Sequence, residues 1–366
     1  MINTDIAIVG AGPAGLTAAI ECAKAGAKVI LIDENAKPGG QLFKQIHKFF
    51  GSKEHRAGTR GIHIGEELLA EAEQLNIDVW LNAQVCGIYE GRELWVVENL
   101  KESRLVKAKA IIIATGATEN AVSFPGWSLP GVIGAGAAQT MINLHGVLPG
   151  KKILMIGSGN VGVIVSYQLM QAGAEVAAIV EASPELGGYG VHTAKIRRAG
   201  VPFFTSHTVL EAKGKDHVQS VVIGELDKEW QPVPGTEKEF EVDTICVAAG
   251  LTPLIELATG AGCQTSFAAS LGGHIPSFDN NMRTSLGTIY VAGDIAGVEE
   301  ASTAMEEGRL AGIHAAADLG FYNAEKVTSL SDQIWKRLNA LRGESISENE
   351  QENDTPVSKE TLDERV

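Results

Sequence analysis

The stretch that decides the fold is IAIVGAGPAG at residues 6–15. Its first four residues are apolar and predict a buried strand, and the glycine turn that follows leads into a helical pattern at about residues 16–25. A second apolar run at residues 28–32 completes a strand–helix–strand unit. Such units build parallel sheets, so the chain is predicted to have an α/β fold.

The glycine turn has the G-x-G-x-x-G pattern that suits the phosphates of a nucleotide. Gly10 permits the tight turn, Gly12 lets the backbone approach a pyrophosphate, and Gly15 lets the helix pack closely on the strand. Asp33 follows Gly15 by 18 residues, where a carboxylate can accept hydrogen bonds from a ribose. We therefore predict a dinucleotide-binding unit. The alternative is a glycine-rich turn without a ligand.

The same pattern recurs about 147 residues later, as GSGNVG at residues 157–162. It lies between an apolar strand and a helical pattern, and Glu181 closes the next strand 19 residues after the last glycine. The residues predicted to hold a second nucleotide are Gly157, Gly159, Asn160, Val161, Gly162 and Glu181. An acid at position 181 favours the free ribose hydroxyl of NAD over the phosphate of NADP. Two alternatives stay open: another adenine nucleotide such as ATP, and a purely structural nucleotide fold.

Three later strands also end in glycine. Ala-Thr-Gly at 114–116 follows one apolar run, and Gly-Leu-Thr-Pro at 250–253 follows another. Gly293-Asp294 follows a short apolar run and precedes a helical stretch that begins near Ala301. An aspartate at a strand end can bind a polyol, and the positive end of a helix can face a group that becomes anionic.

The order of these motifs, with Gly39-Gly40-Gln41 after the first acid, resembles the flavoproteins that have two dinucleotide-binding domains. The resemblance covers about residues 1–320 and implies two Rossmann-like domains, the second inserted into the first. It implies FAD on the outer parts and a nicotinamide nucleotide on the inserted part. The expected segments are an FAD-binding domain at 1–118 and 251–320, an NAD-binding domain at 119–250, a C-terminal helix at 321–342 and a disordered acidic tail at 343–366.

The resemblance also implies roles for individual residues. Those expected to hold the FAD pyrophosphate are Gly10, Gly12, Pro13, Ala14 and Gly15. Asp33, with Glu34 nearby, would bind the adenosine ribose, and Val85 would border the adenine. Those expected around the flavin and its ribityl chain are Gly40, Gln41, Thr115, Gly116, Gly293, Asp294 and Ala301. No residue is assigned a catalytic acid or base role, because the flavin carries the chemistry.

Departures from the family narrow the expected activity. The four cysteines of the chain form no C-x-x-C pair, which excludes thioredoxin or glutathione reductase chemistry. Ile164 stands where many relatives have a glutamate near the nicotinamide, which argues against fast hydride transfer.

The segment PGGQLFK at residues 38–44 resembles the NAD/FAD subunits of heteromeric amine and amino-acid dehydrogenases. That group includes proline and hydroxyproline dehydrogenases, opine oxidases, hydrogen cyanide synthase and sarcosine oxidase. Larger members carry a cysteine-rich iron–sulfur region, but no cysteine follows residue 320 here. An iron–sulfur centre would therefore belong to a separate subunit or be absent.

Composition excludes several other classes. The 366 residues carry 45 acids against 30 lysines and arginines, and a net charge of −15 repels nucleic acid. No apolar run reaches about 18 residues, which argues against a membrane span. The start lacks a basic signal-peptide region, so we expect a cytoplasmic protein. The nine histidines show no spacing typical of metal ligands, so no metal site is predicted.

Together these features predict an FAD-dependent oxidoreductase that moves electrons between flavin, NAD(H) and a partner. The expected role is one subunit of an amine or amino-acid dehydrogenase complex in which a second flavoprotein subunit handles the substrate. The alternatives are a stand-alone NADH:acceptor reductase serving a ferredoxin-like protein, and a nucleotide-binding scaffold with an electron-relay flavin. The apolar side of a helix at 324–342, with Ile334, Trp335 and Leu338, would dock on a partner or pack on the FAD domain.

Overall fold

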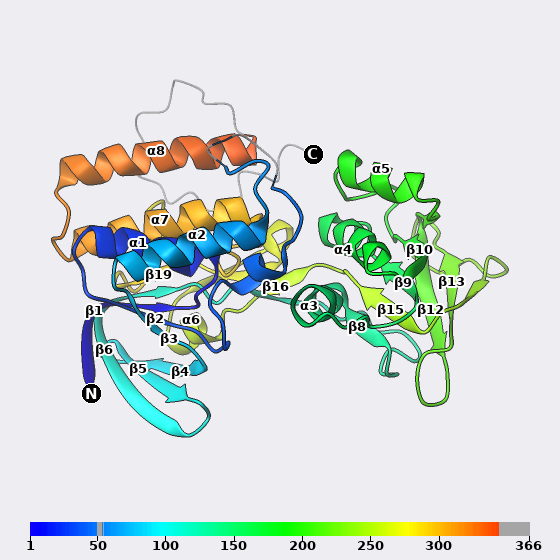
Figure 1. Ribbon diagram of the computed structural model, residues 1–366, viewed down its shortest axis with the longest axis horizontal. Coiled ribbons are helices and arrows are strands. Elements are labelled where there is room, and N and C mark those ends of the chain that lie inside the picture. The colour runs from blue at the N-terminus through cyan, green and yellow to red at the C-terminus, as the bar shows by residue number, and fades with distance from the viewer. Residues whose placement is uncertain (50–52, 54, 344–366) are drawn as a thin grey trace. The chain divides into compact units, whose positions relative to one another are not determined.

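The computed structural model describes residues 1–49, 53 and 55–343 (Figure 1). Contacts between residues divide the chain into two units. One unit comprises Met1–Thr118 and Thr252–Val366, and the other, Glu119–Leu251, is inserted between these two parts. We call them the outer unit and the middle unit. Apart from Gly343, the segment expected to be a disordered tail lies outside the described residues.

A parallel sheet forms the centre of the outer unit. Its strands lie in the order β3 (Asp78–Trp80), β2 (Val29–Ile32), β1 (Ile2–Val9), β6 (Glu102–Ile113) and β19 (Ile289–Val291). The first half of β6 also pairs antiparallel with β5 (Glu93–Glu98), which pairs with β4 (Ala83–Tyr89). In Figure 1, α1 (Pro13–Lys24), α2 (Gly61–Gln74) and α7 (Ala301–Asp318) lie on one side of the sheet, and α8 (Ala324–Arg342) packs on the outer side of α7.

Smaller elements complete the outer unit. They are the 3-10 helices η1 (Gly40–Lys44) and η2 (Ala269–Leu271), the helix α6 (Glu256–Gly260), and a hairpin of β17 (Thr265–Ala268) and β18 (Gly273–Pro276). The chain enters and leaves the middle unit through β7 (Ala117–Glu119) and β16 (Leu251–Pro253), which pair with each other.

The middle unit repeats this architecture on a smaller scale. Its parallel strands lie in the order β11 (Phe203–Phe204), β10 (Glu175–Val180), β9 (Lys152–Ile156), β15 (Thr244–Val247) and β8 (Val132–Gly134). Its helices are α3 (Ala135–His145), α4 (Asn160–Gln171) and α5 (Gly190–Arg198), and β12 (His207–Lys213), β13 (Ser220–Glu225) and β14 (Lys238–Glu241) form an antiparallel sheet. Two Rossmann-like units, one inserted into the other, are the fold predicted from the sequence, and this prediction is confirmed.

Helices α1 and α7 pack closely because α7 presents glycine at the contact. A Cβ on Gly308 would lie 2.1 Å from the carbonyl oxygen of Ala14. Thr17 Oγ1 donates a hydrogen bond to the Met305 carbonyl at 2.9 Å across the same contact. This packing holds α7, which comes late in the chain, against the first turns of α1.

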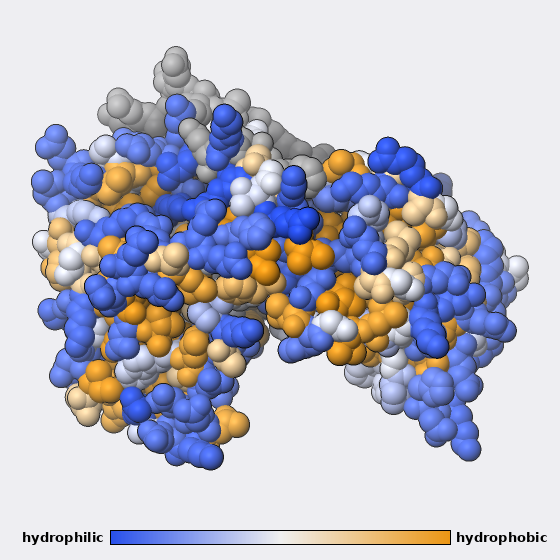
Figure 2. Space-filling view, viewed as in Figure 1, coloured by the Kyte–Doolittle hydropathy of each residue, from blue (hydrophilic) through white to orange (hydrophobic). Residues whose placement is uncertain are grey.

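Helix α8 packs on its own unit rather than leaving its apolar side for a partner. Ile334 is 2% exposed and Leu338 is fully buried, and both belong to the core of the outer unit, with Leu330 and Trp335 packed against it. Where Figure 2 leaves the region of α8 and α1 visible, hydrophilic residues lie beside smaller hydrophobic patches. Of the two alternatives predicted for this apolar side, packing on its own unit is therefore confirmed and docking on a partner is wrong, because burial against the core of the same unit satisfies the hydrophobic side chains of Ile334 and Leu338.

Among the described residues, no helix combines the length and the apolar character needed to cross a membrane.

Candidate functional site

The first glycine loop, residues 10–15, connects β1 to α1. Gly10 has φ of +101°, and a Cβ there would lie 2.3 Å from Ala114 O, while a Cβ on Gly15 would lie 1.7 Å from Gly10 O. Only glycine fits these two positions. Gly12 is different, because its φ is −74° and a Cβ there would meet nothing within 4 Å. The fold therefore requires glycine at positions 10 and 15, whereas position 12 leaves open space beside the backbone.

The start of α1 borders this open space. The helix begins at Pro13, earlier than the predicted start near residue 16, because proline suits a first helical position. Gly12 is the residue before it and has no side chain that could bond to the first N–H groups of the helix. An anion can take that place, since these N–H groups and the helix dipole both favour negative charge.

Segments from distant parts of the sequence meet at this loop. A Cβ on Gly40 would lie 2.8 Å from Gly12 Cα, so the Gly39-Gly40 turn lies against the loop. A Cβ on Gly293 would lie 2.9 Å from Ala14 Cβ, which brings the Gly-Asp motif to the same place. Together with the contact between Gly10 and the Ala-Thr-Gly segment, the structure joins the four motifs that the sequence analysis assigned to one nucleotide.

Asp33 ends β2 and is buried beside the glycine loop. Its Oδ2 accepts the Ala11 N–H at 2.6 Å, and its Oδ1 accepts the backbone and side-chain N–H groups of Asn35 at 2.8 and 2.9 Å. These bonds fix the carboxylate at the loop. A carboxylate has about four acceptor positions, so Asp33 can also accept a bond from a ribose hydroxyl.

The other residues expected around this nucleotide lie at several places in the outer unit. Glu34 and Gln41 are exposed, and Val85 is buried in β4. Thr115 Oγ1 donates to the Leu254 carbonyl at 2.8 Å, and Gly116 has φ of +77°. Their contacts with a cofactor stay predictions.

Asp294 follows β19 just before α7, whose first residue is Ala301. Burial, with the charges of Glu307 and Glu299, raises the pKa of Asp294 to about 6, although the backbone N–H of Glu299 donates to it. Glu307 Oε2 accepts the N–H of Gly293 at 2.9 Å. A carboxyl group held in surroundings that oppose its charge is typical of functional positions.

Two arginines of α8 neutralise the acids near the start of α7. Arg342 donates to Glu307 Oε1 and to Glu299 Oε2, both at 2.7 Å, and Arg337 donates to Glu306 Oε2 at 2.7 Å. Glu307 is 2% exposed, so Arg342 compensates a charge that water cannot reach. The sequence does not indicate these pairs, because their partners lie more than thirty residues apart and no local pattern joins them.

The second glycine loop, residues 157–162, has the same geometry in the middle unit. Gly157 has φ of +94°, and a Cβ there would lie 2.2 Å from Ala248 O. A Cβ on Gly162 would lie 2.2 Å from Gly157 O, whereas a Cβ on Gly159 would meet nothing within 4 Å. The middle unit thus also keeps open space at its central glycine.

Glu181 ends β10 in the way that Asp33 ends β2. Its Oε2 accepts the N–H of Ser158 at 2.8 Å and the Ser158 hydroxyl at 2.7 Å, and its Oε1 accepts the Ser183 N–H at 2.9 Å. Ser158 Oγ also accepts the Gly187 N–H at 3.0 Å. The sequence analysis missed Ser158, Ser183 and Gly187. A signal was available, because a glycine pair follows the acid by six residues in both units.

Asn160 and Val161 form the first turn of α4. Asn160 Oδ1 accepts the N–H of Tyr189 at 2.9 Å, and Val161 is 44% exposed. Asn160 thereby ties the start of α4 to the start of α5, and the role of both residues toward a nucleotide stays a prediction.

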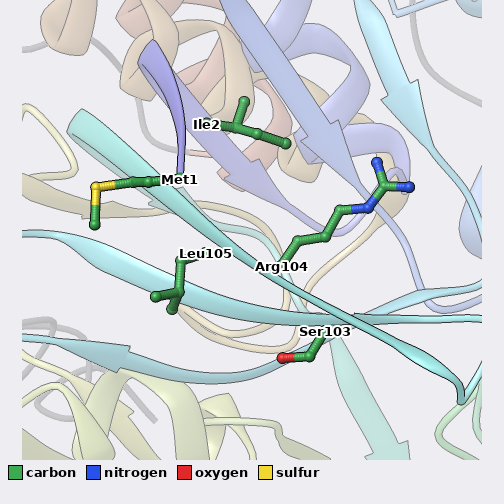
Figure 3. A pocket seen from close by; sticks show the side chains of 5 residues that line it. All are labelled: Met1, Ile2, Ser103, Arg104 and Leu105. Atoms are coloured by element: carbon green, nitrogen blue, oxygen red, sulfur yellow. The ribbon is translucent and has the colours of Figure 1, made fainter.

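Each unit therefore offers what an adenine nucleotide requires: a helix start, a bare glycine beside it, and a fixed carboxylate next to the loop. Within the described ranges, no cluster of His, Cys, Asp or Glu could hold a metal ion. A hollow of about 390 Å³ is lined by Met1, Ile2, Ser103, Arg104 and Leu105 (Figure 3). It lies at the amino end of β1, whereas the glycine loop follows the carboxyl end, so this hollow is not part of the site.

Comparison with known proteins gives a match over most of the chain. The sequence profile of the family described as pyridine nucleotide-disulphide oxidoreductase matches residues 4–308. An opine oxidase subunit of Agrobacterium tumefaciens (strain Ach5) is 31% identical, over 93% of this chain and 71% of the relative. The HcnB subunit of hydrogen cyanide synthase from Pseudomonas aeruginosa is 30% identical, over 85% of this chain and 70% of the relative.

A solved structure is similar in fold. Thioredoxin reductase of T. acidophilum superimposes with a TM-score of 0.72 over 87% of this chain and 99% of its own, at 21% sequence identity.

Proposed function

Because the chain belongs to the pyridine nucleotide-disulphide oxidoreductase family and is an FAD-dependent oxidoreductase, we propose that it is the nucleotide-binding subunit of a heteromeric amine or amino-acid dehydrogenase. The resemblance expected from the motif order is confirmed by the family match and by two relatives that are both named as subunits. The cofactors of the family are FAD and a pyridine nucleotide. The observation that carries the proposal is the pair of glycine loops, each with an open central glycine and a carboxylate held beside it.

In this proposal the outer unit holds FAD. Gly12 and the start of α1 would receive the pyrophosphate, and Asp33 the adenosine ribose. Asp294 would accept a hydrogen bond from the ribityl chain, and the start of α7 at Ala301 would face the pyrimidine edge of the flavin. The support is that Gly40, Gly293 and the Ala-Thr-Gly segment all contact the first glycine loop.

The middle unit would hold NAD(H). Gly159 and the start of α4 would receive its pyrophosphate, and Glu181 its adenosine ribose. Glu181 already accepts three hydrogen bonds, and a 2′-phosphate beside this carboxylate would meet like charge in place of a hydroxyl donor. We therefore assign NAD(H) rather than NADP(H) to this unit.

The protein's own residues would bind and orient rather than transfer protons. Bound FAD would accept electrons and pass them on. Holding two bound groups in register supplies much of the rate in such reactions, so no acid or base side chain is required. The buried pair of Arg342 and Glu307 would keep the Gly293 backbone in place beside the flavin chain.

A partner subunit would handle the amine or amino-acid substrate. The relatives are named as subunits of an opine oxidase and of hydrogen cyanide synthase.

Anaerobic mixing experiments test the proposal. The lone chain and the assembly purified from its native host are each mixed with NADH, and with amino acids and secondary amines, while flavin absorbance is followed. We expect the assembly, but not the lone chain, to bleach rapidly with one of the amines. A Gly12→Val chain, which should lack FAD, is the control for signals that do not come from the bound flavin.

Other results would favour the alternatives. Rapid bleaching of the lone chain by NADH, with turnover of a simple acceptor, would make it a stand-alone reductase. If the flavin bound to this chain never changes its redox state in the assembly, the result would favour the scaffold alternative.

A further inference from the structure

Each unit contains hydrogen bonds that correspond to bonds in the other unit, and this correspondence extends well beyond the glycine loops. The matching bonds are Ala83 N–H to Asp33 O (2.9 Å) and His207 N–H to Glu181 O (3.0 Å), and Asn82 N–H to Asn35 O and Ser206 N–H to Ser183 O (3.0 Å each). The strands that begin there, β4 and β12, both carry an irregularity, after Val85 and after Val209. The repeat therefore extends to the start of β4 and β12, farther along the chain than the glycine loops, acids and glycine pairs that the sequence shows.

A glycine pair follows each acid and bonds back to its glycine loop. In the outer unit the Gly39 N–H donates to the Ala11 carbonyl at 2.7 Å. In the middle unit the Gly187 N–H donates to Ser158 Oγ at 3.0 Å. Position 158 corresponds to position 11, so both glycine pairs are tied to the same point of their loops.

Both pairs also lie against the central glycine of the loop. A Cβ on Gly40 would be 2.8 Å from Gly12 Cα, and a Cβ on Gly187 would be 3.6 Å from Gly159 Cα. In each unit, the open space beside the central glycine is therefore bordered by a second stretch of backbone.

The structure of the middle unit does not itself require glycine at positions 187 and 190. Neither residue has φ in the left-handed region. A Cβ on Gly187 would make only ordinary van der Waals contacts, and one on Gly190, the first residue of α5, would meet nothing within 4 Å. Gly188 differs, because its Cβ would lie 2.7 Å from Ser158 O. Glycine costs conformational entropy on folding, so the presence of glycine at positions 187 and 190 needs an explanation other than the packing of the unit.

We propose that Gly187 and Gly190 leave their side-chain positions empty for the diphosphate of an adenine dinucleotide, which passes between them and Gly159. The inference rests on the proposed function of the middle unit and adds a second wall to its site. Bare backbone on two sides lets phosphate oxygens approach closely, which a Cβ would prevent.

The charge of the segment supports an anionic ligand. Residues 186–198 contain no acid that would repel a phosphate, and their three bases, Lys195, Arg197 and Arg198, lie in the last turn of α5, at the other end of the helix from Gly190. Asn160, at the start of α4, bonds the Tyr189 N–H and so keeps the segment next to the second glycine loop.

Titration of three ligands tests the inference. NADH contains the diphosphate and both nucleosides, ADP contains the diphosphate and one nucleoside, and adenosine contains no phosphate. Gly187→Val and Gly190→Val should each weaken the binding of NADH and of ADP by at least about ten-fold, because the branched side chain fills the space proposed for the diphosphate. Adenosine, followed by ligand-observed NMR, should bind the variants within about two-fold of the wild type, since it does not reach that space.

Matched measurements separate a ligand effect from a folding effect. Gly260, the last residue of α6 in the outer unit, also has ordinary φ and open space at its Cβ, so Gly260→Val is the control and should leave all three affinities unchanged. FAD content and the melting temperature report whether each variant folds.

Each outcome decides something. Unchanged NADH and ADP affinity in both variants overturns the inference but leaves the proposed function standing. Weakened binding of NADH with unchanged binding of ADP also overturns the inference, since the new side chain would then contact a part of NADH beyond the diphosphate. Equal loss of adenosine would mean general damage to the site and would overturn it as well. Wild-type protein that binds neither NADH nor ADP would instead refute the proposed function of the middle unit.

Discussion

Replacing Asp294 with asparagine should stabilise the FAD-free protein at neutral pH and weaken its hold on FAD. Burial and the charges of Glu307 and Glu299 oppose the ionised form of Asp294 and raise its pKa from 3.8 to about 6. Asparagine has nearly the same shape and can still accept the bond from the Glu299 N–H, but it carries no charge. The substitution therefore removes the unfavourable charge and little else.

The size and the pH range follow from the pKa. A group whose folded pKa is raised adds stability below its unfolded pKa, and that stability is lost as the pH rises through the folded pKa. For Asp294 the loss falls between about pH 4 and pH 6 and amounts to about 3 kcal/mol, at about 1.4 kcal/mol per pKa unit. Asp294→Asn should therefore match the wild type at pH 4 and exceed it by up to about 3 kcal/mol at pH 8. The melting temperature at pH 8 should rise by roughly 4–6 °C.

Urea unfolding of the FAD-free wild type and variant, from pH 4 to pH 8, measures this difference. Asp78→Asn, at an exposed position in the same unit, is the control for the loss of a carboxylate as such. FAD affinity of the variant should fall by about 1–2 kcal/mol, because a charged acceptor is lost from the ribityl chain. A variant that is no more stable than the wild type at pH 8, or whose advantage is the same at all pH values, would refute the reasoning about burial and charge.

Four further predictions concern single residues. Gly12→Val should abolish FAD retention, measured as flavin absorbance per chain, because the valine side chain would fill the open space beside α1. Full flavin content in this variant would contradict the placement of the pyrophosphate at this loop. Calorimetric titration should give NADPH at least about ten-fold weaker binding than NADH because of Glu181, and equal affinity would contradict that role. Arg342→Leu should cost about 3–5 kcal/mol in urea unfolding, because Glu307 stays buried without its partner. Leu338→Glu should cost more than about 4 kcal/mol, since the side chain is fully buried in its own unit; a folded variant that merely releases a partner would restore the docking interpretation.

The sequence by itself determined the elements and motifs that are local. The apolar runs at 6–9 and 153–156, the glycine loops after them and the acids at Asp33 and Glu181 can each be recognised within about 35 residues of chain. Strand and helix periodicity, tight glycine turns and helix starts depend on neighbouring residues, so they are visible without a structure. The resemblance to a known family that the order of the motifs carries then implied that one unit is inserted into the other.

Tertiary structure alone decided which distant groups meet and which are buried. The contact of Gly293 with Ala14, the bond from Arg342 to Glu307 and the burial of Leu338 join parts of the chain with no common pattern. The same holds for the pKa of Asp294, which depends on burial of its carboxyl group and on the charges of Glu307 and Glu299. Packing also distinguished glycines that the sequence could not, because Gly188 is needed by its neighbours while Gly187 is not. That distinction depends on which atoms surround a residue in space, and the sequence determines those neighbours only through the complete fold.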